Sequence, residues 1–222
     1  MPESGKIIKF IQETFTQQGF SKAIVAVSGG IDSATSIMLT VKALGKDNVY
    51  SLQLPYKKHQ SMELSDLVIE PAGIPKNQRL VINIGRAADK LAIKLNAKKD
   101  KVRLGNILAR VRMICLFDLA KKLGALVVGT ENKSEKMLGY FTRFGDEASD
   151  LEPIVHLYKT EVIKLAKELG VPAAIIKAAP TAGLWPGQTD EAELGMTYAE
   201  IDARLRQGKI KPTFKLNTPY HL

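Results

Sequence analysis

A short run of serine, glycine and aspartate constrains this chain more than any other part of its sequence. The run Ser28–Ser33, which reads SGGIDS, directly follows the apolar stretch Ala23–Val27. We expect a strand that ends at this run and a helix that begins within it, because glycines permit the bend. Backbone N–H groups at such a bend point outward, and the helix adds the positive end of its dipole. The run therefore predicts a site for an anionic group.

The residue types in the run indicate which anion it binds. The hydroxyls of Ser28 and Ser33 add hydrogen-bond donors, and Asp32 is able to hold a divalent cation against phosphate oxygens. Neither a G-x-x-x-x-G-K-[ST] loop nor a G-x-G-x-x-G pattern occurs in the chain. We interpret Ser28–Ser33 as a pyrophosphate-binding loop without a lysine and call it the phosphate cradle. An ordinary glycine-rich turn between strand and helix is the alternative.

The charge of the chain fits this interpretation. The formal net charge is +9, which suits an anionic partner. A dense basic cluster occurs at 98–103, but aromatic residues make up only 6% and do not alternate with it, so a base-stacking strip is unsupported. A small, highly charged ligand explains the charge equally well, and we expect no nucleic-acid partner.

Length and composition predict one globular domain over residues 1–222, with a variable tail from about residue 208. The longest apolar runs are far too short to span a membrane, and the N-terminal residues lack a signal-peptide pattern. The single cysteine, Cys115, lies in an apolar helical stretch and is expected to be a small buried side chain. These features predict a cytoplasmic protein.

Apolar periodicity predicts strands that alternate with helices. Such alternation is typical of a Rossmann-like α/β fold with a parallel sheet of about five strands covered by helices. The predicted strands are Ala23–Val27, Val49–Leu54, Leu80–Ile84 and Ala125–Val128, and the predicted helices are Ile7–Phe15, Ser33–Leu44, Leu104–Leu123 and Lys159–Leu169.

Ligands of parallel sheets bind beyond the carboxyl ends of the strands. This rule brings the cradle together with Leu54–Lys57 and Thr130–Glu135, which follow two other predicted strands. Glu135 would then complete a magnesium site with Asp32, because Mg²⁺ is commonly held by one or two carboxylates and substrate phosphates. The alternative is that Glu135 is an ordinary first-turn helix residue favoured by the helix dipole.

Further strings occur in the second half of the chain. They are Gly129–Glu135, Gly139–Asp146, Pro180–Trp185, Gly187–Glu191, Leu194-Gly195, and Tyr198 with Ile201-Asp202. With the cradle, these strings make the chain resemble the ammonia-dependent NAD synthetases, a family of N-type ATP pyrophosphatases, over residues 20 to 205. The resemblance implies a fold of the adenine nucleotide alpha-hydrolase type and a homodimer.

The resemblance also implies roles for individual residues. Asp32 and Lys159 would be catalytic, and Asp32 and Glu135 would bind magnesium. Arg110, Arg143 and Asp150 would contact deamido-NAD. The residues implied in ATP binding are Ala26, Val27, Ser28, Gly29, Gly30, Ile31, Asp32, Ser33, Thr130, Lys159 and Thr181.

The reaction implied by the resemblance is the last step of NAD biosynthesis. ATP would activate the nicotinate carboxylate of deamido-NAD as an NAD-adenylate with release of pyrophosphate, and ammonia would then displace AMP to give NAD. A carboxylate needs this activation because its own leaving group would be oxide. The chain offers neither the length nor a catalytic cysteine for a glutaminase domain, so free ammonia is the expected donor. Two segments are candidate lids over the adenylate, Lys57–Gln78 and Gly183–Glu191.

The sequence leaves two alternative functions open, and it departs from the family pattern at two places. A tRNA-thiolating pyrophosphatase would suit the positive charge, although such enzymes rely on reactive cysteines, and a nucleotide-binding subunit without turnover is the other alternative. Arg143 stands where the family more often has lysine, and the His-Lys pair found near the end of relatives has no match here. We interpret the three histidines, His59, His156 and His221, as incidental.

Overall fold

The computed structural model describes residues 1–56, 61–181 and 187–210, and within these ranges a parallel sheet forms the centre of the molecule. Its strands are β1 (Lys22–Ala26), β2 (Val49–Gln53), β3 (Arg79–Val81) and β4 (Ala125–Val128), in the order β3-β2-β1-β4. The predicted α/β fold class is confirmed. The sheet has four described strands where about five are expected, because Leu151 pairs with Val128 only as an isolated bridge.

The strand order places a switch point beside the cradle. From β1 the chain moves outward to β2 and then β3, and it returns across the sheet to form β4 on the other side of β1. Crossovers leave β1 and β4 in opposite directions at such a point, and the connections open a crevice at the carboxyl ends of the strands. The cradle follows β1, and Gly129–Asn132 follows β4.

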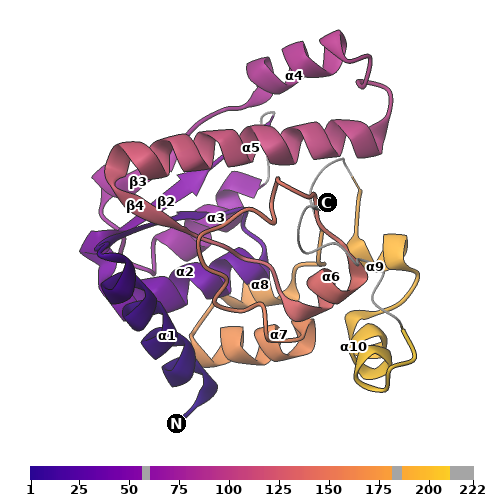
Figure 1. Cartoon of the computed structure of the whole chain (residues 1–222). Coiled ribbons are helices and arrows are strands. Elements are labelled where there is room, and N and C mark those ends of the chain that lie inside the picture. The colour runs from indigo at the N-terminus through magenta and orange to yellow at the C-terminus, as the bar shows by residue number, and fades with distance from the viewer. Residues whose placement is uncertain (57–60, 182–186, 211–222) are drawn as a thin grey trace, which may run out of the picture.

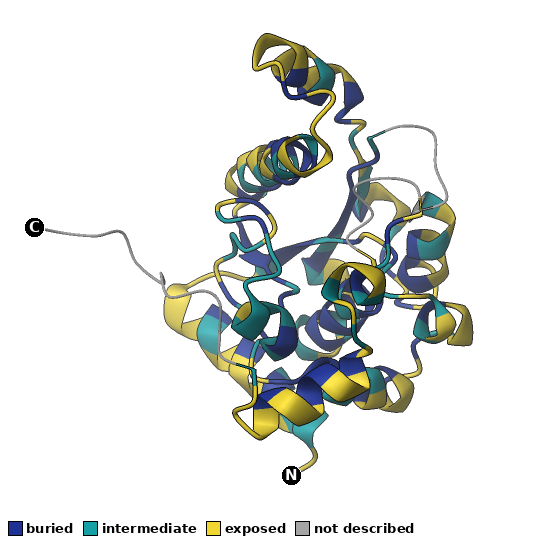
Figure 2. Ribbon diagram, turned by 90° about the vertical axis from the view of Figure 1, so that its right-hand side faces the viewer, coloured by how far each residue is buried: buried dark blue, intermediate teal, exposed yellow. Residues whose placement is uncertain are grey.

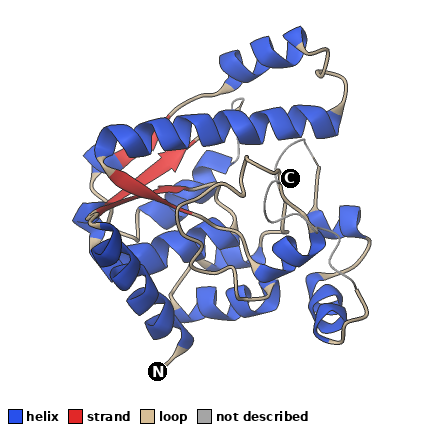
Figure 3. Cartoon of the chain, viewed as in Figure 1, coloured by secondary structure: helices blue, strands red, loops and turns tan. Residues whose placement is uncertain are grey.

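Helices cover both faces of the sheet (Figures 1 and 3). One layer contains α1 (Glu3–Gln18), α2 (Ile31–Leu44), α3 (Ser61–Ile69), α7 (Lys159–Glu168) and α8 (Ala173–Lys177). It packs on Ala23 and Val25, whereas Ile24 faces the second layer, which contains α4 (Gly85–Lys94) and α5 (Lys101–Leu123). Successive residues of β1 are thus buried on opposite faces, and this explains why its sequence is apolar throughout. Figure 2 shows the buried residues gathered between these layers.

Short helices form a third region next to the carboxyl edge of the sheet. These are α6 (Lys133–Leu138), α9 (Asp190–Leu194) and α10 (Tyr198–Arg206). Tyr158, Tyr198, Ile201 and Leu205 form a small apolar cluster of their own, packed against Met137 and Leu194. This region supports the loops that follow β4. Two 3₁₀ turns, Lys46–Asn48 and Lys76–Gln78, precede β2 and β3.

Several element boundaries differ from the prediction. Helix α2 begins at Ile31, two residues earlier than expected, so Asp32 lies in its first turn. Helix α5 begins at Lys101 because the Asp100 carboxylate caps it, accepting from the backbone N–H of Arg103. Strand β3 ends at Val81 instead of Ile84.

The candidate lid Lys57–Gln78 contains α3, which ends before Pro71. Residues 57–60 and 182–186, which belong to the two candidate lids, lie outside the described residues, as do His59, His221 and the tail from 211. Cys115 is half-buried rather than fully buried, and burial raises the pKa of its thiol. None of the described helices combines the length and apolar character needed to cross a membrane.

Candidate active site

The phosphate cradle joins β1 to α2 and is held open by its own serines. Gly29 has φ +86°, which turns the chain without steric strain. The Ser33 hydroxyl donates to the Gly30 carbonyl at 2.9 Å, and the Ser28 hydroxyl accepts from the Gly30 N–H at 3.2 Å. Gly30 caps α2 without a side chain, so no side-chain cap occupies the N–H groups of the first turn. These groups are positioned to donate to an anion.

A buried lysine lies at the edge of the cradle. Lys159 Nζ donates to Asp32 Oδ2 at 2.5 Å and to Glu135 Oε1 at 3.0 Å. The lysine side chain is 2% exposed, and the side chains of Asp32 and Glu135 are 15% and 17% exposed. The predicted catalytic and metal-binding residues Asp32, Glu135 and Lys159 therefore meet at one point, although they lie on three different helices.

The ionisation of Lys159 follows from these contacts. Burial by itself would lower the pKa of Lys159, but the charges of Asp32 and Glu135 outweigh burial and raise it above its ordinary value. A buried ammonium is stable only when it is paired and hydrogen-bonded. We therefore describe Lys159 as a permanently charged group at the end of the cradle.

The two carboxylates suit a magnesium ion. Their oxygens converge on the same small region, since both contact one lysine nitrogen. Mg²⁺ in nucleotide sites is typically held by one or two carboxylates together with phosphate oxygens. Among the described residues no group of three or more acidic, histidine or cysteine side chains is placed to hold a metal unaided, so the phosphates would have to complete the coordination.

Asn132 orients this centre, a role that the sequence did not reveal. It is fully buried, its amide nitrogen donates to Asp32 Oδ1 at 3.0 Å, and its oxygen accepts from the N–H of Glu135 at 3.0 Å. The second contact caps α6 and forms a capping box with Glu135. One side chain thus sets the position of both predicted metal ligands. The pattern N-x-x-E at the start of a helix could have predicted the capping box, but not the contact with Asp32.

Asp202 joins three helices, α6, α7 and α10, and its role was also missed. Its carboxylate accepts from the Ser134 hydroxyl at 2.5 Å and from the Thr160 N–H at 2.9 Å. The Ser134 oxygen in turn accepts from the N–H of Lys159 at 2.9 Å. These bonds tie α10 to the first turns of α6 and α7, which carry Glu135 and Lys159. Asp202 is part of the Ile201-Asp202 motif that contributes to the family resemblance. The sequence alone did not predict that its carboxylate connects these helices.

An aromatic wall closes one side of Lys159. The ring of Tyr198 lies 5.0 Å from Lys159 Nζ, and its hydroxyl donates to Asp190 at 3.1 Å. Tyr140 donates to Asp190 and Glu193. Burial, together with the nearby carboxylates, raises the pKa of Tyr198, which keeps its hydroxyl protonated. Tyr198 therefore contributes a neutral donor and a cation–π contact instead of a negative charge.

Two of the residues predicted to contact the dinucleotide, Arg110 and Arg143, meet each other. Arg110 Nε on α5 donates to the backbone oxygen of Arg143 at 3.2 Å, and the Arg143 guanidinium stacks 4.7 Å from the Phe144 ring. Asp150 is exposed, and its Oδ2 accepts from the N–H of Val127 on β4 at 2.7 Å. Thr130 is half-buried at the end of β4, and Thr181 is exposed beside the undescribed residues 182–186.

The Glu152 carboxylate occupies the space where a side chain at Gly129 would begin. A Cβ at this position would lie 2.0 Å from Glu152 Oε1. Glu152 Oε2 accepts from the N–H of Glu131 at 3.1 Å, and Oε1 accepts from the Ser149 hydroxyl at 2.7 Å. The carboxylate therefore lies directly against the turn that carries Thr130 and Asn132.

We expect Gly129→Ala to displace the Glu152 carboxylate and to lower the free energy of unfolding by about 1 to 3 kcal/mol, because the buried bonds to Glu131 and Ser149 are lost. Urea denaturation followed by circular dichroism measures this change. In a Glu152→Ala background the same substitution should cost clearly less, since its steric conflict is gone. Equal costs in both backgrounds would contradict the explanation.

The fold and the site together define a nucleotide-binding enzyme of the adenine nucleotide alpha-hydrolase type. The family model for NAD synthase matches residues 3–217, so the chain belongs to the NAD synthase family. An NH₃-dependent NAD⁺ synthetase from Pyrococcus horikoshii is 47% identical over 89% of this chain and 76% of the relative. The corresponding synthetase from Chlorobaculum tepidum is 43% identical over 90% of this chain and 71% of its own length.

Solved structures agree with this assignment. An NMN synthetase from Francisella tularensis superposes with a TM-score of 0.85 at 37% identity, covering 95% of this chain and 87% of that one. An NH₃-dependent NAD synthetase from Campylobacter jejuni superposes with a TM-score of 0.75 at 30% identity, covering 95% of this chain and 87% of that one. Ammonia-dependent members of the family are ligases that use ATP to amidate deamido-NAD in the last step of NAD biosynthesis. The expected family and enzyme class are thereby confirmed.

Proposed function

We propose that this chain forms NAD from deamido-NAD, ATP and ammonia by adenylating the nicotinate carboxylate. One observation carries the mechanism. The open cradle adjoins a buried, permanently charged Lys159 that is held between Asp32 and Glu135. The Lys159 ammonium and the free N–H donors of the cradle thus lie together where a triphosphate would bind, while no described side chain in this centre is arranged as a nucleophile.

In the first step a nicotinate carboxylate oxygen attacks the α-phosphorus of ATP. A bond between this oxygen and phosphorus forms, the bond from phosphorus to the bridging oxygen breaks, and its electron pair leaves with pyrophosphate. The first-turn N–H groups of α2 and the Lys159 ammonium stabilise the charge that develops on the phosphate oxygens. Magnesium bound by Asp32 and Glu135 would supply further neutralisation of the phosphates.

In the second step ammonia attacks the carbonyl carbon of the adenylate. A carbon–nitrogen bond forms, the bond from carbon to the AMP oxygen breaks with its electron pair going to AMP, and the nitrogen loses one proton. Asp32 and Lys159 act in the first step, because they are placed at the cradle. Ala26 to Ser33, Thr130, Lys159 and Thr181 bind ATP in this proposal, and Arg110, Arg143 and Asp150 bind deamido-NAD.

The mononucleotide is a second candidate substrate. The Francisella tularensis structure with a TM-score of 0.85 is an NMN synthetase. The chemistry at the carboxylate would be the same, and the two substrates differ only in the adenylate half that lies farther from the reacting carbon. The described residues Arg110 and Arg143 lie on the exposed side of the site, where this half would be recognised.

The test is a separation of nucleotide products after incubation with Mg²⁺, ATP, ammonium and either nicotinate substrate. We expect AMP and NAD in equal amounts from deamido-NAD, at a higher kcat/KM than AMP and NMN from the mononucleotide. A higher kcat/KM for the mononucleotide would reverse the substrate assignment. ADP as the nucleotide product would overturn the mechanism.

We also propose that the chain acts as a homodimer of single-domain subunits in the cytoplasm, without a nucleic-acid partner. Support for the dimer comes from large apolar side chains that are exposed on the α4–α5 layer, the upper layer in Figure 1. They are Leu91, Ile93, Leu95, Val102 and Ile114. Monomeric proteins rarely expose so many apolar side chains on one layer, and such patches are typical of interfaces.

We expect Ile114→Asp to convert the dimer into a monomer, because Ile114 is 60% exposed at the middle of α5 and a buried charge there would be unpaired. Size-exclusion chromatography with light scattering measures the mass. The exposed Lys121→Asp on the same helix is the matched control and should leave the mass unchanged. If the Ile114 variant is still a dimer, the interface does not include this part of α5.

A further inference from the structure

Two carboxyl groups lie beside the site and have no part in the steps above, one buried (Glu131) and one half-buried (Glu152). Glu131 follows the turn after β4, and Glu152 follows the bridge residue Leu151. The N–H of Glu131 donates to Glu152 Oε2 at 3.1 Å, and the Ser149 hydroxyl donates to Glu152 Oε1 at 2.7 Å. Because these contacts fix Glu152 against the backbone of Glu131, the two acids form a pair.

The Glu131 carboxyl group lacks half of its hydrogen-bond partners. Its side chain is 5% exposed, and Oε1 is buried without a partner among the described residues. The nearest cation, Lys136 Nζ, lies 3.9 Å from the other oxygen and is itself half exposed. Buried oxygens are almost always hydrogen-bonded. An unpartnered one therefore indicates a place where a hydrogen-bond donor binds.

Burial also disfavours the ionised forms of both acids, and the surroundings do not offset this effect. Burial raises the pKa of Glu131 to about 7, which Lys136 only partly offsets, and the neighbouring Glu147 and Asp146 raise it further. Burial likewise raises the pKa of Glu152 to about 8. A small cation between these groups would favour their ionised forms and lower the cost of burying them.

The pair of acids lies between the residues predicted to bind ATP and the loop predicted to contact the dinucleotide. Its neighbours in sequence are Thr130, predicted to contact ATP, and Asn132, which bonds to Asp32. Glu131 is faced by Asp146 and Glu147 of the loop that carries Arg143. A ligand held by Glu131 would thus be close to both the adenylating centre and the substrate loop.

We propose that Glu131 and Glu152 bind the ammonium ion that becomes the amide nitrogen, an inference that rests on the proposed function. Ammonium is a small cation with hydrogen-bond donors only, and it matches the free Glu131 Oε1, the Glu152 carboxylate and the Ser149 hydroxyl oxygen. A divalent metal fits less well, because the described residues provide no group of three acidic, histidine or cysteine side chains able to hold one here.

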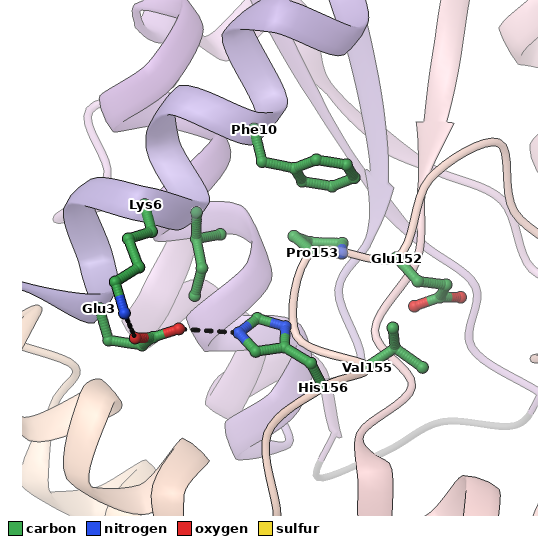
Figure 4. Close-up of a pocket in the computed structure, with 8 residues that line it drawn as sticks. Glu3, Lys6, Phe10, Glu152, Pro153, Val155 and His156 are labelled. Carbon is green, nitrogen blue, oxygen red and sulfur yellow. Dashed lines mark hydrogen bonds and ion pairs between the residues drawn. The ribbon is translucent and has the colours of Figure 1, made fainter.

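Access to this pair is separate from the cradle. Glu152 is one of the residues that line a cavity of about 380 Å³ between α1 and the segment 152–156, and no cradle residue lines it (Figure 4). Glu3, at the cavity wall, accepts from Lys6 at 2.9 Å and pairs with His156 Nε2 at 2.9 Å. The cavity therefore reaches Glu152 from a side of the molecule that no cradle residue lines.

The experiment compares ammonium with hydroxylamine as the nitrogen nucleophile in Glu131→Gln and Glu152→Gln. Hydroxylamine is uncharged at neutral pH, so it attacks the adenylate without needing a cation site. We expect the KM for ammonium to rise about 10- to 100-fold, the value of one or two charged hydrogen bonds. The rate with hydroxylamine and the ATP–pyrophosphate exchange driven by deamido-NAD should stay near the wild-type values. Glu70→Gln, on an exposed side chain, is the matched control.

The outcomes separate this inference from the proposed function. An unchanged KM for ammonium in both variants would overturn the ammonium site. An equal loss with ammonium and hydroxylamine would overturn it as well, because it would show that the acids only support the fold. Wild-type protein without pyrophosphate exchange or AMP formation would instead overturn the proposed adenylation, whatever the variants do.

Discussion

Replacing Lys159 by methionine is expected to lower the adenylation rate by about 10²- to 10³-fold, the effect of removing one charged donor at a developing phosphate charge. The same change leaves Asp32 and Glu135 as two adjacent carboxylates without a counter-charge. Breaking a buried ion pair from one side costs about 3 to 5 kcal/mol, so the free energy of unfolding should fall as well. Pyrophosphate exchange and urea denaturation measure the two effects.

The control is Lys164→Met on the exposed face of the same helix, which should change neither quantity by much. Magnesium should restore part of the lost stability of Lys159→Met, since a cation between the carboxylates replaces the missing ammonium. A Lys159→Met protein with a wild-type exchange rate would remove the lysine from the mechanism.

Asp32→Asn is expected to abolish measurable turnover and yet to lower the free energy of unfolding by less than Lys159→Met does, although the amide group can accept only one of the two bonds from Asn132 and Lys159. The contrast has an electrostatic cause, because Lys159 keeps Glu135 as a partner at 3.0 Å and no uncompensated charge is created. Loss of one of two metal-binding carboxylates should cost several kcal/mol of transition-state stabilisation, about 10³-fold in rate.

The measurement is the rate of AMP formation at increasing Mg²⁺, together with a thermal melt. Asp118→Asn, an exposed residue of α5, is the control and should behave as the wild type. If Asp32→Asn turns over at more than a tenth of the wild-type rate, the metal role assigned to Asp32 is wrong.

The cradle could be predicted from the sequence because its conformation depends on residues that are close together along the chain. Serines and glycines directly after an apolar strand are sufficient for the bend, and the hydrogen bonds between Ser28, Gly30 and Ser33 are all local. The parallel sheet was predictable for a similar reason, since strands buried on both faces need continuous apolar runs. Lys159 was assigned through family resemblance alone, because it lies 127 residues from Asp32 along the chain.

Contacts between residues far apart along the chain could not be predicted from the sequence. Asn132 meets Asp32 across 100 residues, and Asp202 meets Ser134 across 68. Polar residues of these types are common at helix ends, so only the fold shows that they position the lysine centre. Helix α4 and the short helices α9 and α10 were not expected either, because a few turns give too little periodicity to separate a helix from a loop.

The central claim is that the nicotinate carboxylate itself becomes bonded to the AMP phosphorus. Deamido-NAD carrying heavy oxygen in this carboxylate tests it directly when the products of a single turnover are analysed by mass spectrometry. The mechanism predicts one heavy oxygen in the phosphate of AMP for each molecule of NAD formed, with the other retained in the amide of NAD. AMP without heavy oxygen, with the label in water or in inorganic phosphate, would contradict the adenylate and with it the role given to the cradle.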